Sequence, residues 1–516
     1  MFFFLIHFST ESALVIDLGG QYVKACIVSE QGSISFINNE NLAPFIPFAY
    51  AKTTSSSLIG DEAIRQLKNN RTIGGQFIGA IFGKNRKYLS QNQELYKLSD
   101  SSFFDQIHPA SLLLYFLTEF SKYATPNRTA KTILIVPGYT TPFIRTQIDI
   151  IAKVSFFNDI NIVTDVECLS ALLIEKYSDH VLDSFKTIMF IDFGSFSTKI
   201  TFITIGPGTD NKPQAYLIRY AFNEKCGLEE TALRIMNNGK GEFKNGYQAS
   251  KQSLNREKAR KKLRKIENID DYDDVFATEF TKLYHETKNS IRVDEIQLIG
   301  GGARLPFVTN LISKIVISDK TNSSKENTII SKNYNNFEAI TEGGALIYHM
   351  YAKSLTSSHN TLHPIYFKYL STKYKIVKPK GIIYKSFSVP FEKNNATICL
   401  KTHKKFVPKG ISTKLFEMSI VNTTQLDKNS KWIFSFVTQY EEHYIRSVNA
   451  CSKEKCVELE LQNNFISEID LMLQFLQGTK DMSEIMKYMS NDKKTFDNDF
   501  YDFLKKNLTK MPDWEL

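Results

Sequence analysis

The chain has 516 residues, of which 42% are hydrophobic and 23% are charged. This apolar share is enough for sizeable cores, so composition excludes a wholly disordered chain, and no apolar run approaches the ~20 residues of a membrane-spanning helix. The formal net charge of +9 allows nucleic acid or an anionic membrane as a partner, although a lysine-rich surface is the simpler explanation. The length predicts about three domains.

The first residues predict a short secretory signal. Met1-Phe2-Phe3-Phe4-Leu5-Ile6-His7-Phe8 is apolar and is followed by small residues, with a cleavage point near Ser12. The run has the minimum length and no Lys or Arg before it, so a loose tail or a first strand stays open as the alternative. We assign residues 1–13 as a signal peptide and expect a strand to begin at Leu14.

The six cysteines fall into two groups. Four show no metal-binding spacing and are expected to be small buried hydrophobes: Cys26, Cys168, Cys226 and Cys399. Cys451 and Cys456 lie between two apolar-rich segments, so we expect them on opposite sides of a hairpin mouth. A cross-strand disulfide in an oxidising compartment and two reduced thiols are both open.

From Leu14 onward, strand-like and helix-like segments alternate, which predicts an α/β domain. A buried strand at 14–18 enters a glycine turn, and a return strand follows at 22–28. The next predicted strands are 131–136 and 160–163, and the predicted helices are 64–67, 77–82, 110–120, 144–154 and 170–177.

The opening motif then recurs. Ile191-Asp192-Phe193-Gly194 ends a second buried strand, 192 − 17 = 175 residues after Asp17, and a return strand follows at 199–205. A third glycine turn, Gly300-Gly301-Gly302, follows the strand 296–299, and a helix at 342–353 closes the unit. The repetition predicts two similar lobes that face each other.

The residue pattern of the sequence changes after about residue 354. Residues 356–364 are predicted as a linker, and 365–463 carry short β-rich runs that predict an antiparallel sandwich. These runs are 384–389, 397–400, 431–437 and 457–461. Apolar residues on a helical period predict a helical tail over 464–516.

The Asp-x-Gly turns indicate phosphate and metal chemistry. Glycine lets backbone N–H groups approach phosphate oxygens closely, and a carboxylate at a strand end can hold Mg²⁺ through its waters. Two such turns from opposing lobes, at Asp17 and Asp192, could clamp a triphosphate.

These residues resemble the heat-shock protein 70 (DnaK-type) chaperone family. Ile16-Asp17-Leu18-Gly19 and Ile191-Asp192-Phe193-Gly194 resemble its two phosphate motifs, and 298–306 resembles its adenosine motif. Ile135-Val136-Pro137-Gly138-Tyr139 and the helix from Glu338 resemble further family segments in the same order over residues 14–355. Within the family, Val23-Lys24-Ala25-Cys26-Ile27-Val28 is most similar to the large glucose-regulated, hypoxia-induced branch of the endoplasmic reticulum.

The resemblance implies an α/β fold of the two-lobed actin-like ATPase type, followed by a β-sandwich-like region and a short helical C-terminal segment. It implies a nucleotide-binding domain over 14–355, with lobe I at 14–184 and 340–355 and lobe II at 185–339. From their position after this domain, the 365–463 region and the helical tail are expected to form a substrate-binding part, with a structural appendage as the alternative.

The resemblance also implies ATP or ADP with Mg²⁺ as cofactors, and it assigns roles residue by residue. Asp17 and Asp192 would hold Mg²⁺ through water, and Glu167 would orient the attacking water, which makes these three the catalytic residues. Those expected to line the phosphates are Gly19, Gly20, Gln21, Gly194, Ser195 and Phe196. Those expected around the adenosine are Glu257, Arg260, Lys261, Arg264, Gly301, Gly302 and Arg304.

Three positions depart from the family. Its catalytic lysine aligns with Gly79, an aspartate near the second phosphate loop aligns with Lys199, and a glycine aligns with Phe196. Because electrostatic stabilisation of the transferring phosphoryl group is a large catalytic term, we expect weak or absent hydrolysis. A large gain in turnover from Gly79→Lys would place this position at the γ-phosphate. Only 300 − 264 = 36 positions separate Arg264 from Gly300, so the chain is also trimmed.

The resulting prediction is an ATP-binding, chaperone-like protein of the secretory pathway with a role in the stress response. It would assist folding as a holdase or as a nucleotide-exchange partner of a lumenal heat-shock chaperone, and it would bind unfolded or nascent polypeptides. A fully active folding chaperone and a nucleotide-free scaffold are the alternatives. The expected location is the endoplasmic reticulum lumen, with the cytoplasm as the alternative; no nucleic-acid partner and no membrane span are expected.

Overall fold

The computed structural model describes most of the chain up to residue 352 and the strands beyond it. The described residues are 12–53, 56–67, 73–76, 78–79, 109–124, 131–140, 145, 148–149, 151–152, 155, 157–179, 182–208, 213–236, 261–289, 291–322, 329–331, 334–335, 337–352, 365–369, 372–377, 386–390, 397–402, 414–421, 431–439, 444–451 and 456–463. The chain divides into two compact units, one made of residues 1–140 and 151–358 and one of 141–150 and 359–516.

The first unit is mixed α/β, as predicted, and contains several sheets. The first sheet has the strand order β3-β2-β1-β8-β9, with β4 paired to β2. Its strands are β1 (Ala13–Leu18), β2 (Tyr22–Val28), β3 (Ile34–Phe36), β4 (Ile46–Pro47), β8 (Lys131–Val136) and β9 (Asn158–Thr164). The predicted hairpin is present: β1 pairs antiparallel with β2, while β8 runs parallel to β1.

The second sheet repeats this plan with the strand order β12-β11-β10-β13-β14. Its strands are β10 (Lys186–Phe193), β11 (Thr198–Pro207), β12 (Pro213–Asn223), β13 (Glu295–Ile299) and β14 (Ile329–Ser331). β10 pairs antiparallel with β11 and parallel with β13, just as β1 pairs with β2 and β8. A small third sheet joins β6 (Ser57–Ile59), β5 (Ala49–Lys52) and β7 (Ile73–Gln76).

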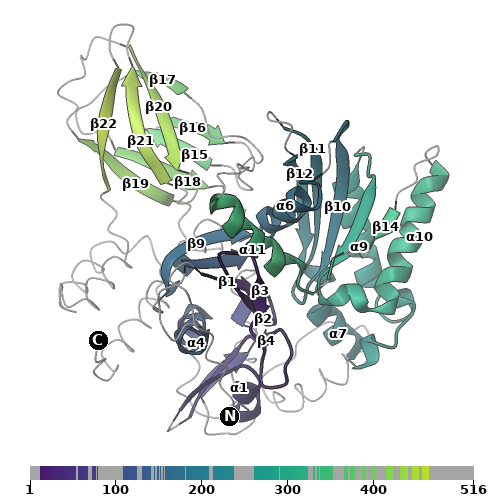
Figure 1. Cartoon of the computed structure of the whole chain (residues 1–516). Helices are drawn as coiled ribbons and strands as arrows, with labels where there is room; N and C mark the ends of the chain where they lie inside the picture. The colour runs from purple at the N-terminus through teal and green to yellow at the C-terminus, as the bar shows by residue number, and fades with distance from the viewer. Residues whose placement is uncertain are drawn as a thin grey trace. The chain divides into compact units, whose positions relative to one another are not determined.

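Helices cover both faces of the second sheet. Among the described residues of the unit, the α-helices are α1 (Gly60–Gln66), α4 (Pro109–Ala124), α6 (Asp165–Lys176), α7 (Leu228–Met236), α9 (Asp274–Lys288), α10 (Pro306–Asn322) and α11 (Ala339–Ala352). The short 3₁₀ turns are Glu224–Cys226, Ile269–Asp271 and Gly301–Arg304. α6 packs against α11 and contacts β9 of the first sheet and β11 and β12 of the second, which places it between the two sheets (Figure 1).

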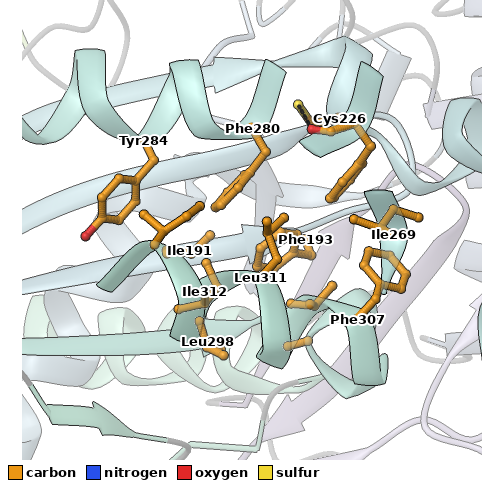
Figure 2. Close-up of a cluster of buried hydrophobic side chains, with 14 of the residues drawn as sticks. Ile191, Phe193, Cys226, Ile269, Phe280, Tyr284, Leu298, Phe307, Leu311 and Ile312 are labelled. Carbon is orange, nitrogen blue, oxygen red and sulfur yellow. Dashed lines mark hydrogen bonds between the residues drawn. The ribbon is translucent and has the colours of Figure 1, made fainter. Parts of the chain in front are cut away.

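The apolar run in β10 is continuous because the strand is buried on both faces. Ile191 and Phe193 point into a cluster with Phe280 of α9 and Phe307 of α10, which Figure 2 shows in close-up. Ile188 and Phe190, at the alternate positions, point into a second cluster that includes residues of α6, α11, β1 and β8. This second core is shared by the two sheets, so it fixes the two Asp-x-Gly hairpins relative to each other.

In the described part of the second unit, the backbone forms eight antiparallel strands in the order β16-β15-β18-β19-β22-β21-β20-β17. They are β15 (Ile365–Tyr369), β16 (Thr372–Val377), β17 (Ser386–Pro390), β18 (Thr397–Thr402), β19 (Lys414–Val421), β20 (Lys431–Gln439), β21 (Tyr444–Cys451) and β22 (Cys456–Asn463). Every strand run predicted in 365–463 overlaps one of them, and Cys451 and Cys456 are register partners between β21 and β22.

Several predictions concern residues that the structure does not describe. The apolar start of the signal peptide, the linker at 356–364 and the helical tail at 464–516 lie outside the described residues, and most of the predicted helices at 77–82 and 144–154 do too. The first strand starts at Ala13, one residue before the predicted start. Within the part of the chain that the structure describes, no helix is long and apolar enough to cross a membrane.

Candidate functional site

The two Asp-x-Gly turns come into direct contact. A Cβ atom on Gly20 would lie 2.6 Å from Cδ2 of the Phe196 ring, so this ring packs on the backbone of the first turn. Beside it, Ser195 Oγ donates a hydrogen bond of 3.4 Å to Gln21 Oε1. Four residues expected at the phosphates therefore meet from two separate sheets, and the Phe196 ring fills space between the turns.

Asp17, at the end of β1, forms an ion pair with Lys24 of β2. The two residues are opposite each other in the antiparallel register, and their side chains are only 8% and 12% exposed. Lys24 Nζ also donates a hydrogen bond of 3.1 Å to the carbonyl oxygen of Phe337, and it lies 5.1 Å from the centre of that ring. The first strand-end carboxylate is thus neutralised by a lysine of its own hairpin.

Asp192, at the end of β10, has the equivalent partner. Lys199 lies opposite it in the register, and Lys199 Nζ is 2.6 Å from Asp192 Oδ2. The same ammonium group is 2.7 Å from Oδ2 of Asp165, the first residue of α6. Asp165 Oδ1 accepts a hydrogen bond of 2.8 Å from the backbone N–H of Gly138. Lys199 therefore joins the end of β10 to the ends of β8 and β9 in the other sheet.

The electrostatics of this cluster follow from its burial. Burial is the main cause of the raised pKa of Asp165, which the nearby Lys199 ammonium partly offsets. Burial alone would lower the pKa of Lys199, but the attraction of Asp165 and Asp192 outweighs it and holds that pKa well above its usual range. Lys199 is therefore a fixed positive charge at neutral pH.

Glu167, predicted to orient the attacking water, caps α6. Its Oε2 accepts hydrogen bonds from Thr164 N at 2.6 Å and from Thr164 Oγ1 at 2.7 Å. The Glu167 N–H donates in return to Thr164 Oγ1 at 3.3 Å, which completes a capping box. The catalytic role of Glu167 stays a prediction, while Asp165 is the carboxylate of this turn that reaches Lys199.

Gly79, where the family's catalytic lysine is missing, packs on the first turn. A Cβ at this position would lie 2.2 Å from the carbonyl oxygen of Gly19 and 2.6 Å from that of Gly20. Position 79 is therefore next to the predicted phosphate turn, as the resemblance implies. The contact also leaves no room for any side chain unless the turn moves.

The third glycine turn lies against Asp192. Gly300 has a φ of +82°, which favours glycine, and a Cβ there would lie 2.2 Å from Asp192 Oδ1. A Cβ on Gly302 would lie 2.5 Å from Leu228 Cδ1 and 2.8 Å from Phe193 Cβ. The predicted adenosine motif thus joins the second phosphate turn.

Phe337 covers this motif. The Arg304 guanidinium lies 5.5 Å from the centre of the Phe337 ring, and a Cβ on Gly301 would be 3.5 Å from that ring. On its other side, Phe337 packs edge-on against Phe45, with ring centres 5.0 Å apart. Phe337 therefore connects the adenosine motif to Lys24 and to the first sheet.

The rest of the predicted adenosine wall is only partly described. Lys261 and Arg264 have exposed side chains at the end of a helical stretch, whereas Glu257 and Arg260 lie outside the described residues. Arg304 contacts the Phe337 ring, and this contact does not connect it to Lys261 or Arg264. The role of these two residues in binding adenosine therefore stays a prediction.

The residues predicted to hold Mg²⁺ do not fit a water-coordinated ion well. Mg²⁺ keeps several waters in proteins and needs carboxylate oxygens that are open to that water shell. Asp17 and Asp192 are 5% and 7% exposed, and each already contacts a buried ammonium group. Among the described residues, no group of three or more metal-binding side chains is arranged to hold a metal. The magnesium site stays a prediction, and these contacts oppose it.

Sequence reasoning missed Asp165, Phe337 and the pairing of Lys24. Asp165 directly follows the parallel strand β9, so its position at a carboxyl strand end matches that of Asp17. Lys24 lies 24 − 17 = 7 residues after Asp17, and Lys199 lies 199 − 192 = 7 residues after Asp192. This equal spacing was the available signal. No pattern in the sequence indicated a role for Phe337.

Comparison with known proteins gives two distant relatives. Over 392 residues, the chain is 22% identical to a ribosome-associated molecular chaperone of Zygosaccharomyces rouxii, covering 65% of this chain and 61% of that protein. Over 406 residues, it is 21% identical to Hypoxia up-regulated protein 1 of Xenopus laevis, covering 66% of this chain and 62% of that protein. The chain thus spans about three fifths of the length of these relatives. No family model matches it.

Proposed function

Because this chain is a divergent relative of the heat-shock protein 70 chaperones, we propose that it is a nucleotide-binding, chaperone-like protein that hydrolyses ATP slowly or not at all. It acts as a holdase or as a nucleotide-exchange partner of a lumenal heat-shock chaperone. Its nucleotide site is built from the two Asp-x-Gly turns and the third glycine turn of the first unit.

One observation supports this proposal above the others: the turns after β1 and β10 meet. They come from two sheets with the same pairing plan, and the contacts of Phe196 with Gly20 and of Ser195 with Gln21 bring them together. Backbone turns rich in glycine are suited to phosphate because a ligand can approach their backbone closely. Facing turns of this kind suit a chain of phosphates better than a single anion.

The same residues argue for slow chemistry. Phosphoryl transfer depends on positive charge placed at the transferring group. Gly79 supplies none, and Lys199, the cation beside the second turn, is committed to Asp165 and Asp192. The residues of the site therefore bind and orient phosphates, while the cation expected at the γ-phosphate is lacking at position 79.

The chaperone role belongs to the second unit in this proposal. Eight antiparallel strands follow the nucleotide-binding unit, and an extended polypeptide can be held by such a β-rich module. The clients are unfolded or nascent polypeptides. We place the protein in the endoplasmic reticulum lumen, in line with the predicted signal peptide, and the cytoplasm is the alternative.

A nucleotide-free scaffold is the second candidate, and the Phe196 ring favours it. This ring packs directly on Gly20, so a phosphate chain between the turns needs the ring to move. Phe196→Ala removes the obstruction. Tighter nucleotide binding by this variant would show that the ring restricts a real site.

Thermal unfolding with added nucleotide tests the proposal. A ligand that binds only the folded state at 100 times its Kd stabilises it by about 2.7 kcal/mol, so ATP or ADP must raise the melting temperature. No shift for the wild type or for Phe196→Ala would favour the scaffold. Turnover as fast as that of an ordinary chaperone of the family would refute slow hydrolysis, and failure to suppress aggregation of an unfolded model protein would refute the holdase role.

A further inference from the structure

Asp17 and Asp192 are each paired with a lysine of their own hairpin. Lys24 lies opposite Asp17 and Lys199 lies opposite Asp192, at the same distance along the chain. All four side chains are nearly buried, with exposures between 8% and 12%. The two ion pairs are therefore a repeated feature of the site and not two unrelated surface contacts.

The lysines change the charge that a phosphate ligand meets. Asp17, Asp165 and Asp192 bring three negative charges to the two turns, and Lys24 and Lys199 bring two positive charges. The cluster has a net charge of −3 + 2 = −1, and its positive charge equals that of one divalent ion. Three unpaired carboxylates would instead repel phosphates unless a metal ion came with them.

Protein oxygen atoms hold both ammonium groups in place. An ammonium group carries three N–H donors. Lys24 directs contacts to Asp17 and to the Phe337 carbonyl oxygen, and Lys199 directs contacts to Asp165 and Asp192. These contacts hold both ammonium groups at the ends of the strands, beside the two turns.

We propose that Lys24 and Lys199 take the place of the divalent cation, so that this site binds nucleoside di- and triphosphates without Mg²⁺. This inference rests on the proposed nucleotide binding and adds to it the form in which the nucleotide is bound. Mg²⁺ would have to displace two buried ammonium groups from their carboxylates, and each would then be a buried charge without its partner.

Calorimetric titration of the full-length protein with ATP and with ADP, in EDTA and in excess Mg²⁺, tests the inference. We expect the Kd in EDTA to lie within about threefold of the Kd in Mg²⁺, since a tenfold change would mark a real energetic contribution of the metal. Binding that weakens tenfold or more in EDTA would overturn the inference and leave nucleotide binding intact. Absence of binding in both buffers, also for Phe196→Ala, would overturn both.

Variants of the lysines give a second readout. Lys199→Met is expected to weaken binding in EDTA by tenfold or more, and Mg²⁺ should then restore part of it, because two carboxylates are released. Lys199→Arg keeps the charge and should keep binding independent of metal. If nucleotide binding by Lys199→Met depends on Mg²⁺ no more than binding by the wild type does, the inference is contradicted. If Lys199→Met does not fold, the Kd values of the wild type in EDTA and in Mg²⁺ decide whether the inference holds.

Lys176→Met is the matched control. Lys176 of α6 forms an ion pair of 3.4 Å with Glu295 of β13, so it is also a lysine between the two sheets. It touches neither turn, and its replacement should leave the Kd unchanged in both buffers. A comparable loss of binding in Lys176→Met would show that Lys199 acts only through stability.

Discussion

Replacing Gly79 by alanine is the sharpest test of how the first turn is packed. The new Cβ would lie 2.2 Å from the carbonyl oxygen of Gly19 and 2.6 Å from that of Gly20, far below ordinary contact. Both atoms belong to the backbone, so no side-chain rotation relieves the overlap and the turn itself must shift. Overpacking of this kind costs about 1–3 kcal/mol, and we expect the upper end of that range.

Urea unfolding measures the loss, and Gly301→Ala is the control. A Cβ on Gly301 meets only the Phe337 ring at 3.5 Å, so this variant should lose less than about 1 kcal/mol. Equal midpoints for the two variants at equal m-values would refute the packing described for Gly79. Because Gly79→Lys carries the same overlap, we expect it to be destabilised without a gain in turnover. A large gain would show that the turn opens and that position 79 reaches the γ-phosphate.

Four further outcomes are expected. Lys199→Met leaves two buried carboxylates without their cation and should cost about 3–5 kcal/mol in the same titration; a loss below about 1 kcal/mol would contradict the buried cluster. Burial raises the pKa of Tyr139 to about 12 from 10.0, so the unfolded phenol ionises first. Stability should therefore fall as the pH rises from about 10 to 12, by about 2–3 kcal/mol, and a flat melting temperature over that range would refute this. Burial likewise raises the pKa of the Cys226 thiol to about 12, so a thiol reagent should label it only in urea, and rapid labelling of the native protein would be the contrary result. Cys451 and Cys456 should form a disulfide in protein from an oxidising compartment, seen as the loss of two hydrogen atoms by non-reducing mass spectrometry, and two free thiols would exclude it.

The elements that sequence patterns predicted well are those in which one physical signal dominates. β1 and β10 each carry an unbroken apolar run directly before their aspartate because both faces are covered there, and each is followed by a glycine turn. Three of the four cysteines expected as buried hydrophobes are buried free thiols, and Cys399 has no described side chain. In both cases the chemistry of a single residue type was sufficient.

The start of α6 shows where the patterns failed. The predicted helix began at Ser170, but the helix begins at Asp165, because apolar periodicity does not register a polar first turn. The Thr-x-x-Glu spacing of Thr164 and Glu167 is a capping-box pattern, which indicates a helix start at this point. The error mattered, because it hid Asp165, whose carboxylate is part of the site. β12, at Pro213–Asn223, was missed since it is an edge strand with mixed exposure.

Lys24 and Lys199 are difficult to recognise from the sequence because basic residues are frequent throughout the chain. Lys and Arg fill 64 of 516 positions, so a basic residue at one given position is expected with a chance of 64/516, or about one in eight. For one given offset, a basic residue after both Asp17 and Asp192 has a chance of about one in sixty-four, and because many offsets are possible, the shared spacing alone is a weak signal. Antiparallel pairing supplies the explanation, because each hairpin sets its seventh residue opposite the carboxylate, and a charge that composition assigned to the surface lies instead at the centre of the site.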